Sequence, residues 1–242
     1  MPTLEVTNLR KNYGAVVVAD DVDLSIDVGE CVGIIGPNGA GKSSVFGLIA
    51  GSVAADGGRI VLDGRDITRL PGYKRARLGI GRAFQTPQPF ADLTVYENVL
   101  SAAASGGGLR GAGMAESAAR ALERAGLTAK ADLRAGALTL LDRKSLELAR
   151  ALATRAKVLM LDEIGGGLTD REVGRLVELI RELKRDHAII WIEHIAHALK
   201  SVADRILVLH YGKKLIEGPP AEVMSGPIVR EIYMGLKADG AG

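Results

Sequence analysis

The sequence predicts an α/β domain with a mainly parallel core sheet, and three observations support this fold class. Continuous apolar runs of strand length recur along the chain: CVGII at 31–35, KVLMLD at 157–162 and AIIWIE at 188–193. Such runs are typical of strands that are buried on both faces, as in parallel sheets. Segments of helical character alternate with these strands, which indicates an α/β domain. Finally, 47% of the 242 residues are apolar, which is enough for a sizeable core.

The first third of the chain is predicted to add an antiparallel β subdomain. Residues 3–30 contain pieces in which apolar and polar side chains partly alternate, as in antiparallel strands. The stretch 44–51 has helical character and stops at Gly51. Residues 57–67 are predicted to form a hairpin, with Asp63-Gly64 as its two-residue turn.

The middle of the chain lacks apolar strands and is predicted to be a helical subdomain inserted between strands. Thr94 and Glu97 have the spacing of a capping box, which marks the start of a helix. Residues 105–113 are expected to form a flexible glycine-rich loop. Two further helices are expected at 114–126, where Gly126 ends the first, and at 143–156.

The last third alternates again between strands and helices. A second capping box, Thr169 and Glu172, precedes a helix with a regular apolar face. That face is made by Val173, Leu176, Val177, Ile180 and Leu183. A strand pair that turns near Gly212 follows, and then a final helix at about 220–236. We expect a single domain over 1–242, with 1–86 and 156–242 as core and β subdomain and 87–155 as the helical subdomain.

Composition narrows the possible function classes. The 31 basic residues balance the 29 acidic ones, so charge gives no argument for a nucleic-acid partner. The single cysteine, Cys31, excludes an intrachain disulfide and is expected to be a core residue. The chain begins without the apolar stretch of a signal peptide, and no segment approaches the ~20 apolar residues of a membrane span. We therefore expect a soluble chain, whose role at a membrane would require a partner.

The strongest local signal is a phosphate-binding loop of the form GxxxxGK[ST] between a strand and a helix. Its glycines let backbone N–H groups turn toward phosphate oxygens, and the following helix contributes its positive end. Lys42 is expected to reach the β- and γ-phosphates, and Ser43 to ligate Mg²⁺. The candidate ATP-binding residues of this loop are Gly36, Pro37, Asn38, Gly39, Ala40, Gly41, Lys42, Ser43 and Ser44.

Two carboxylates at the end of the strand 157–162 complement this loop. Asp162 is placed to hold Mg²⁺ through water, and Glu163 to orient the attacking water or accept its proton. Charged strand ends are common, so the pair alone would be weak evidence. Together with the phosphate-binding loop, it indicates a nucleotide hydrolase.

Three further residues, in the right order, resemble motifs of the ATP-binding cassette (ABC) ATPases. Gln85 in GRAFQTP is similar to the Q-loop glutamine, which in that family touches Mg²⁺ and links the ATP site to the transporter. His194 in WIEHIAHAL is similar to the switch histidine that contacts the γ-phosphate and water. Tyr13 in KNYG lies where the adenine-stacking aromatic is found, although it could be an ordinary strand aromatic. The resemblance covers about residues 3–236 and implies ATP and Mg²⁺ as cofactors.

Within that family, the chain resembles the ATP-binding subunits of branched-chain amino acid importers. The matching pieces are GRAFQTPQPFADLTVYENV, LELARALATRAKVLMLDE, WIEHIAHAL, ADRILVLHYGKKLIEGPPAEVM and VREIYMGL. The resemblance implies membrane permease subunits, a second ABC ATPase subunit and, indirectly, an extracytoplasmic substrate-binding protein as partners. It implies no nucleic acid, and a location at the cytoplasmic face of the membrane. Related ATPases for urea, amide, aromatic-acid or lipopolysaccharide traffic share these pieces. A lipid exporter, a soluble ABC ATPase and a non-catalytic regulatory module are the alternatives.

Two segments depart from the family pattern. The signature LSGGQ is replaced by Leu138, Thr139, Leu140, Leu141 and Asp142. Leucines should hinder the close backbone approach to phosphate that glycine permits. Asp142 would either repel phosphate or cap the next helix, and we favour the cap; Thr139 keeps a hydroxyl that could reach phosphate.

The loop 164–169 after Glu163 carries three glycines and is expected to be flexible, with Thr169 as a helix N-cap. These departures favour an asymmetric heterodimer, in which a partner's intact signature completes this chain's ATP site. A homodimer remains an alternative if the altered signature works normally in its own subfamily.

Overall fold

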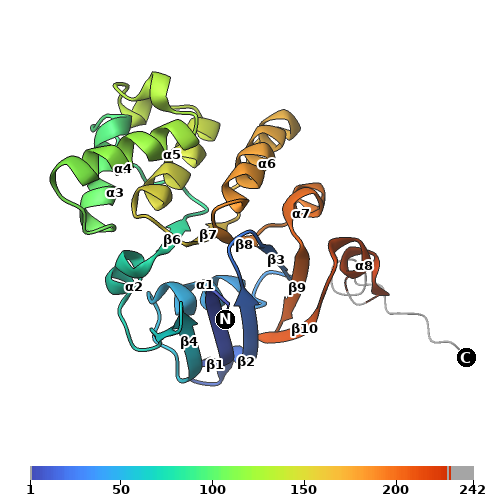
Figure 1. Ribbon diagram of the computed structural model, residues 1–242. Coiled ribbons are helices and arrows are strands. Elements are labelled where there is room, and N and C mark those ends of the chain that lie inside the picture. Colours follow the sequence, from blue (N-terminus) through green and yellow to red (C-terminus); the bar gives the residue numbers. More distant parts are fainter. Residues whose placement is uncertain (1, 228, 230–242) are drawn as a thin grey trace, which may run out of the picture.

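The computed structural model describes residues 2–227 and 229, and a six-stranded sheet lies at their centre (Figure 1). Its strands are neighbours in the order β10-β9-β3-β8-β7-β6. All neighbouring pairs are parallel except β9 with β10, which confirms the predicted mainly parallel core sheet. The strands are β3 (Cys31–Ile35), β6 (Ile80–Ala83), β7 (Val158–Asp162), β8 (Ala188–Ile192), β9 (Arg205–His210) and β10 (Lys213–Gly218).

A second, antiparallel sheet has the order β2-β1-β4-β5 and confirms the predicted β subdomain. It is built from β1 (Leu4–Tyr13), β2 (Val16–Ile26), β4 (Gly57–Leu62) and β5 (Arg65–Asp66). Asp63 and Gly64 form the β4–β5 turn with φ angles of 48° and 76°. Two consecutive left-handed residues are typical of a two-residue hairpin turn, so the predicted hairpin is confirmed.

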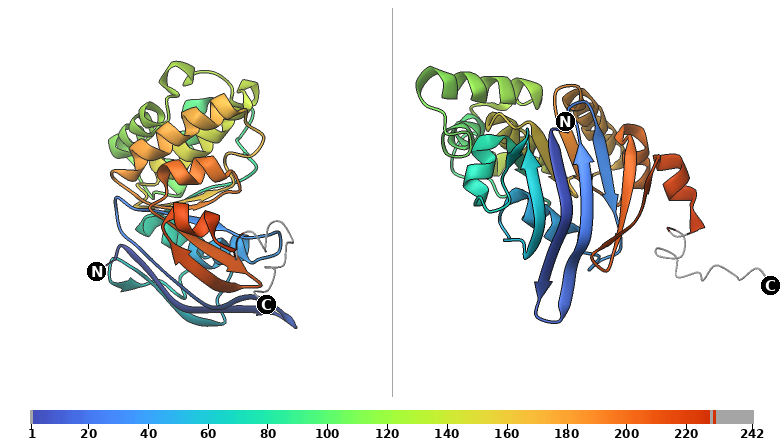
Figure 2. Two further views of the ribbon diagram at one scale, coloured as in Figure 1. Left: turned by 90° about the vertical axis from the view of Figure 1, so that its right-hand side faces the viewer. Right: turned by 60° about the horizontal axis from the view of Figure 1, so that its bottom comes forward.

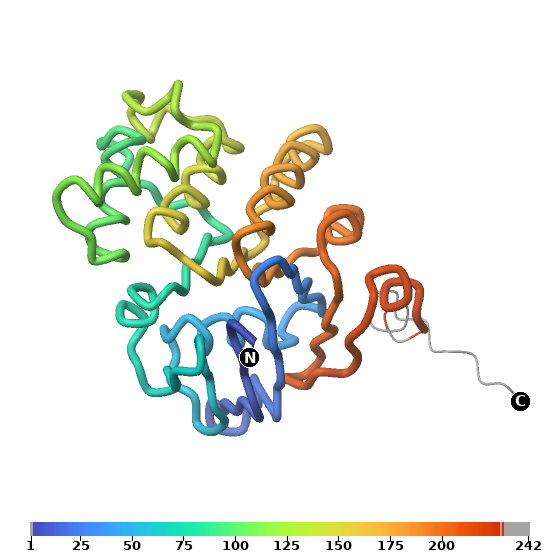
Figure 3. Tube along the Cα trace, viewed as in Figure 1, coloured from blue at the N-terminus to red at the C-terminus, as the bar shows by residue number. Residues whose placement is uncertain are grey.

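Three helices gather in a lobe to one side of both sheets (Figures 1 and 3). The chain leaves the central sheet after β6, runs through α3, α4 and α5, and returns at β7. The lobe contains α3 (Val95–Ser105), α4 (Gly111–Arg124), α5 (Leu140–Ala153) and the 3₁₀ turns η1 (Thr128–Lys130) and η2 (Ala135–Ala137). The inserted helical region is thus confirmed, while its exact limits at 87 and 155 remain a prediction.

The other helices cover the central sheet. They are α1 (Lys42–Ala50), α2 (Gly72–Leu78), α6 (Asp170–Lys184), α7 (Ala196–Val202) and α8 (Pro220–Ser225). Figure 2 shows the antiparallel sheet and the helical lobe on opposite sides of the central strands. Alternate side chains of the buried strands therefore enter two cores: Val158 and Met160 face α1 and the antiparallel sheet, whereas Leu159 and Leu161 face the helices of the other side. This alternation is the reason why these strands are apolar at every position.

Local signals placed several helix ends correctly. Gly51 ends α1 with a φ of 79°, and both predicted capping boxes, at Thr94 and Thr169, are formed. The apolar face predicted for α6 is buried in full.

Other helix limits were wrong. The expected glycine-rich loop at 105–113 is shorter, because α3 extends to Ser105 and α4 already begins at Gly111. Helix α5 begins three residues before the predicted start, because Thr139 caps it. Of the final helix expected at 220–236, Pro220–Ser225 is helical as α8, and most of the remainder, including the ending VREIYMGL apart from Val229, lies outside the described residues.

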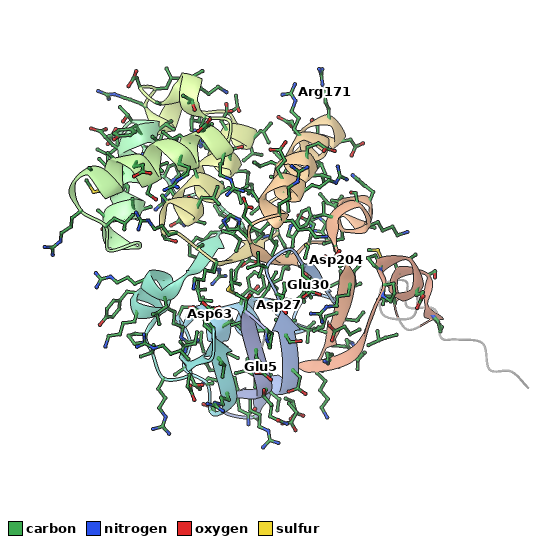
Figure 4. All side chains as sticks on the ribbon, in the orientation of Figure 1. Glu5, Asp27, Glu30, Asp63, Arg171 and Asp204 are labelled. Atoms are coloured by element: carbon green, nitrogen blue, oxygen red, sulfur yellow. The ribbon has the colours of Figure 1, made fainter. Side chains whose placement is uncertain are left out.

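The edge of the central sheet at the amino ends of β3 and β9 carries charged side chains, among them Glu30 and Asp204 (Figure 4). Cys31 lies just inside this edge and is fully buried, as expected for a core residue, and burial raises the pKa of its thiol to about 12. Among the described residues, none of the helices combines the length and the apolar character that crossing a membrane requires.

Candidate functional site

The phosphate-binding loop lies at the opposite edge, between the carboxyl end of β3 and the amino end of α1. Residues 36–41 turn tightly here, and the Ala40 N–H donates to the Pro37 carbonyl at 3.1 Å. The turn between β9 and β10 supports the loop, because the Gly212 N–H donates to the Ala40 carbonyl at 2.9 Å. The loop leads directly into the amino end of α1 at Lys42, and a helix N-terminus favours a bound anion.

Two glycines of this loop are required by close backbone contacts. Gly41 has a φ of 100°, and a Cβ there would lie 2.3 Å from the Val18 carbonyl oxygen. A Cβ on Gly36 would lie 2.2 Å from the carbonyl oxygen of Leu209 in β9. Any side chain at either position would push the loop away from the strands that hold it, so glycine is needed for the loop's shape.

Lys42 folds over the loop. Its Nζ donates to the carbonyls of Gly36 at 2.7 Å and of Pro37 at 3.0 Å. Partial burial lowers the pKa of Lys42, whereas the charges of Glu163 and Asp162 raise it. The ammonium group therefore lies within the electrostatic field of the predicted catalytic carboxylate, Glu163, and of the predicted Mg²⁺ ligand, Asp162.

The three predicted Mg²⁺ ligands meet in one pocket. Ser43, Gln85 and Asp162 line a cavity of about 570 Å³ together with Phe84, Thr86, Gln88, Glu147 and Arg150. The donors are a hydroxyl, an amide oxygen and a carboxylate, which are the hard oxygen ligands that Mg²⁺ prefers. Mg²⁺ normally keeps water and phosphate oxygens as its other ligands. The residues present therefore fit this ion.

Glu163 adjoins this pocket in an uncommon backbone conformation. Its φ is 45°, in the left-handed region that non-glycine residues seldom adopt. Its N–H donates to the carbonyl of Ile192 at 2.8 Å, and its Oε2 accepts from Gln85 Nε2 at 2.5 Å. The structure thus brings the Q-loop candidate and the candidate base into direct contact.

His194 and Tyr13 lie at the margin of this arrangement. His194 follows β8, its side chain is 61% exposed, and its Nδ1 lies 3.2 Å from Glu193 Oε1. The Tyr13 ring is 52% exposed, with Lys11 Nζ at 5.2 Å from its centroid. The stacking of Tyr13 against adenine stays a prediction.

Glu193 is a functional candidate that our sequence reasoning missed. Its side chain is completely buried, and its carboxylate accepts the N–H groups of Gly165 and His194, both at 2.9 Å. One carboxylate therefore fixes both the loop after Glu163 and the start of the His194 loop. Its position directly before His194, at the end of an apolar strand, was the available signal.

Lys144 was missed as well. It is 3% exposed, and its Nζ donates to the Gln85 carbonyl, so a side chain of α5 binds the backbone of the Q-loop. Burial lowers the pKa of Lys144, while Glu193, Glu147 and Glu163 raise it. Nothing in the sequence separates this lysine from the other charged residues of an amphipathic helix.

The altered signature region forms the start of α5, and one prediction about it was wrong. Asp142 is not the N-cap: Thr139 is, because its Oγ1 accepts the Asp142 N–H at 3.3 Å. Asp142 lies in the first turn and binds Lys130 Nζ at 2.6 Å. Partial burial by itself raises the pKa of Asp142, but hydrogen bonds from Lys130 and Thr139 outweigh it and lower this pKa. The Thr139 hydroxyl, named above as a group that could reach phosphate, donates to Asp142 Oδ2 at 2.7 Å.

The loop after Glu163 packs against this region. A Cβ on Gly167 would lie 3.2 Å from Cδ2 of Leu140, a side chain that is 43% exposed. A Cβ on Gly165 would lie 2.7 Å from Glu193 Oε2. The glycines of this loop permit close packing, and the N–H groups of Gly165 and Gly166 are both hydrogen-bonded. The expected flexibility of the loop stays a prediction.

Comparison with known proteins agrees with this geometry. The family model described as ABC transporter matches residues 19–165. The high-affinity branched-chain amino acid transport ATP-binding protein BraF of Pseudomonas aeruginosa is 36% identical, over 97% of this chain and 98% of that protein. The corresponding protein LivG of Escherichia coli K12 is 35% identical over the same shares. The lipopolysaccharide export system ATP-binding protein LptB of Acidithiobacillus ferridurans is 36% identical over 96% of each chain.

Solved structures give the same result. A nucleotide-free ATP-binding cassette from an ABC transporter superposes with a TM-score of 0.89 at 31% identity, covering 98% of this chain and all of that one. The structure of an ATP-binding cassette of an ABC transporter in its ADP conformation superposes with a TM-score of 0.89 at 32% identity and equal coverage. With the phosphate-binding loop, the strand-end carboxylates and the helical lobe in their expected places, the chain belongs to the ATP-binding proteins of the ABC transporter family.

Proposed function

We propose that this chain hydrolyses Mg-ATP and thereby powers an ABC importer. The observation that carries the proposal is the convergence of Ser43, Gln85 and Asp162 on one cavity, with Glu163 bound to Gln85. These residues come from three segments that lie far apart in the sequence. They meet at the carboxyl edge of the parallel strands, and ligands bind at this edge in sheets of this kind.

Each residue has a distinct part in the proposed reaction. The loop N–H groups and Lys42 hold the phosphates and offset their developing charge. Ser43, Gln85 and Asp162 would hold Mg²⁺, which when bound neutralises charge on the β- and γ-phosphates. Glu163 orients the attacking water and takes its proton. His194 and Gln85 sense the γ-phosphate, and Glu193 keeps the His194 loop in place.

The replacement Glu163→Gln tests the proposed role of Glu163 as the base. Glutamine keeps the shape of the side chain but cannot accept the proton, so ATP binding is retained and turnover falls by about 10²-fold or more. ATP binding and single-turnover hydrolysis are measured in the same preparation. A matched control is Glu178→Gln, which removes an exposed carboxylate on α6. Near-normal turnover in Glu163→Gln would refute the assigned role.

A groove next to the Q-loop provides the surface for a permease. Phe84 and Phe90 are 51% and 50% exposed, and both line a cavity of about 390 Å³ between β6 and the helical lobe. Exposed aromatic side chains of this kind are typical of protein interfaces. The groove shares Phe84 with the cavity of the proposed Mg²⁺ ligands, so a permease element bound there would lie close to the ATP site.

Branched-chain amino acids, or a related small polar, amide or organic-acid compound, are the cargo that we propose. The support is similarity to BraF and LivG over nearly the whole chain, and the partner set follows: permease subunits, a second ATPase subunit and a substrate-binding protein, with this chain peripheral on the cytoplasmic face. Similarity to LptB makes lipopolysaccharide export the second candidate.

Purification of the tagged protein from its native membranes in mild detergent, followed by mass spectrometry, separates these candidates. Two multi-span permeases, a second cassette and a substrate-binding protein would support import. Partners of a lipid exporter would support the second candidate. Recovery of ribosomal or DNA-associated proteins without any integral membrane protein would refute transport.

A further inference from the structure

An arginine outside the predicted site lies directly on the carboxylate proposed for Mg²⁺. Arg82 is the third residue of β6, and its Nη2 donates to Asp162 Oδ2 at 2.6 Å. The two side chains are only 17% and 9% exposed. In this partly desolvated position the ion pair is worth more than a surface pair, and each charge is costly without the other.

Aromatic rings position the guanidinium of Arg82. Its Cζ lies 4.8 Å from the ring centroid of Phe84 and 5.8 Å from that of Phe46. Its Nε, however, is buried without a hydrogen-bond partner in the part of the chain that the structure describes. An unsatisfied buried donor destabilises the structure. The packing therefore aims the guanidinium at Asp162 without satisfying all of its donors.

Another buried arginine shows how a purely structural guanidinium is held. Arg75 in α2 is 1% exposed, and its Nε and both terminal nitrogens donate to backbone carbonyls. The acceptors are the carbonyls of Leu48, Ile49, Thr68 and Leu70. No carboxylate takes part in these hydrogen bonds. Arg82 differs because it donates to Asp162, a carboxylate that is also proposed to hold Mg²⁺.

We propose that Arg82 is a positioning residue that competes with Mg²⁺ for Asp162. This inference rests on the proposed Mg-ATP site. Before the metal binds, Arg82 neutralises Asp162 and keeps the pocket from repelling the phosphates. Mg²⁺ bound with the nucleotide would offset the Asp162 charge in place of Arg82, and the guanidinium would then be free to leave the carboxylate. Two cations that are attracted by the same carboxylate, directly or through water, weaken one another by the same factor, since coupling between binding sites is reciprocal.

This competition predicts opposite effects on metal-free and metal-bound nucleotide. Without the Arg82 charge, Asp162 repels metal-free ATP, so binding in EDTA weakens. Binding with Mg²⁺ strengthens, because no guanidinium has to be displaced. The ratio of the ATP dissociation constant in EDTA to that in saturating Mg²⁺ therefore rises, by about tenfold for a coupling of ordinary size. A merely structural role of Arg82 would weaken both affinities and leave the ratio unchanged.

The test is titration of the full-length chain with a fluorescent ATP analogue, in EDTA and in saturating Mg²⁺. Arg82→Gln should raise the ratio about tenfold, whereas Arg82→Lys, which keeps the charge, should stay near the wild-type ratio. Arg150→Gln is the matched control. Arg150 lines the cavity of the proposed Mg²⁺ ligands, but it pairs with Glu147 at 2.7 Å and lies over the ring of Phe90. Thermal unfolding of each variant verifies that it is folded.

The outcomes distinguish this inference from the proposed function. A ratio that is unchanged or lowered in Arg82→Gln overturns competition, and an equal rise in Arg150→Gln reduces the effect to the general charge of the cavity. If the wild-type protein binds nucleotide without any dependence on Mg²⁺, the proposed Mg-ATP site itself fails. If Arg82→Gln does not fold, Arg82→Lys and Phe84→Leu serve instead. Phe84→Leu removes an aromatic contact of the guanidinium and should raise the ratio by a smaller factor.

Discussion

The phosphate-binding edge and the start of α5 differ in how closely they follow the ABC pattern. At the phosphate-binding edge, the glycines, Lys42 and the strand-end carboxylates are all present; Lys42 binds the loop, and Gln85 binds Glu163. At the start of α5, leucines replace two glycines, and Lys130 and Thr139 bind the carboxylate of Asp142. In ABC dimers these two regions serve different ATP molecules. One chain can therefore keep its own half of an ATP site while altering the half that it offers to a partner.

The altered region is built into the fold instead of being a local defect. Leu140 occupies space next to Gly167, where a larger residue would crowd it. Lys130 and the Thr139 cap stabilise the first turn of α5 around Asp142, since both groups satisfy its carboxylate. Gly167 and Leu140 thus fit one another, although they lie more than twenty residues apart in the sequence.

The largest effect is expected when the phosphate-binding lysines of the two subunits are changed separately. In the heterodimer that we propose, Lys42→Ala should reduce ATP turnover by about 10²-fold, because the intact signature of the proposed partner would complete this site. The equivalent change in the proposed partner should reduce turnover much less, because the partner's ATP would face Leu140 and Leu141. Turnover is measured with permease present, and Lys74→Ala, an exposed lysine of α2, is the control. Equal losses from both lysine changes would refute asymmetry.

A smaller effect of opposite sign is expected when glycine is restored in the signature region. The double replacement of Leu140 and Leu141 by glycine should raise turnover at the partner's ATP by about tenfold, if close backbone approach is worth one ordinary hydrogen bond. Stability should fall by about 1 kcal/mol per glycine in the helix. Leu133→Gly, an exposed leucine elsewhere in the lobe, controls for flexibility. Unchanged turnover would mean that the leucines are not what limits this site.

The smallest effect concerns the contact between the helical lobe and the core. His187 is buried beside Arg124 of α4, and its Nδ1 lies 2.8 Å from the Leu183 carbonyl. Burial lowers the pKa of His187 below 6.5, although the hydrogen bond to Leu183 raises it. The unfolded chain therefore takes up this proton more readily than the folded one, so stability is full above pH 6.5 and falls as the pH drops below it.

Urea unfolding at pH 7.5 and pH 5.5 measures this effect. His187→Gln should reduce the loss of stability between the two values by on the order of 1 kcal/mol. His197→Gln, an exposed histidine of α7, should leave it unchanged. An identical pH dependence of stability in wild type and His187→Gln would show that protonation of this histidine does not destabilise the protein.

Much of the site was predictable, because its chemistry depends on short segments. The phosphate-binding loop, Asp162 and Glu163 each stand directly after an apolar strand, and parallel strands bring their carboxyl ends to one edge. Glu193, Lys144 and Arg82 were not predicted. Each acts through a residue that is distant in sequence or through the backbone of another loop, and a charged residue beside an apolar run is normally only a surface group.

The sequence by itself determined the fold class, the capping boxes, the Asp63-Gly64 turn and the phosphate-binding loop, because periodicity and turn chemistry are local properties. The tertiary structure alone decided that Thr139, and not Asp142, caps α5, that Leu140 packs on Gly167, and that Arg82 binds Asp162. Those contacts depend on which strands become neighbours and on how the helical lobe packs against them. Which elements become neighbours is decided by the burial of the apolar faces of helices and sheets against one another, and no single segment of the sequence encodes this.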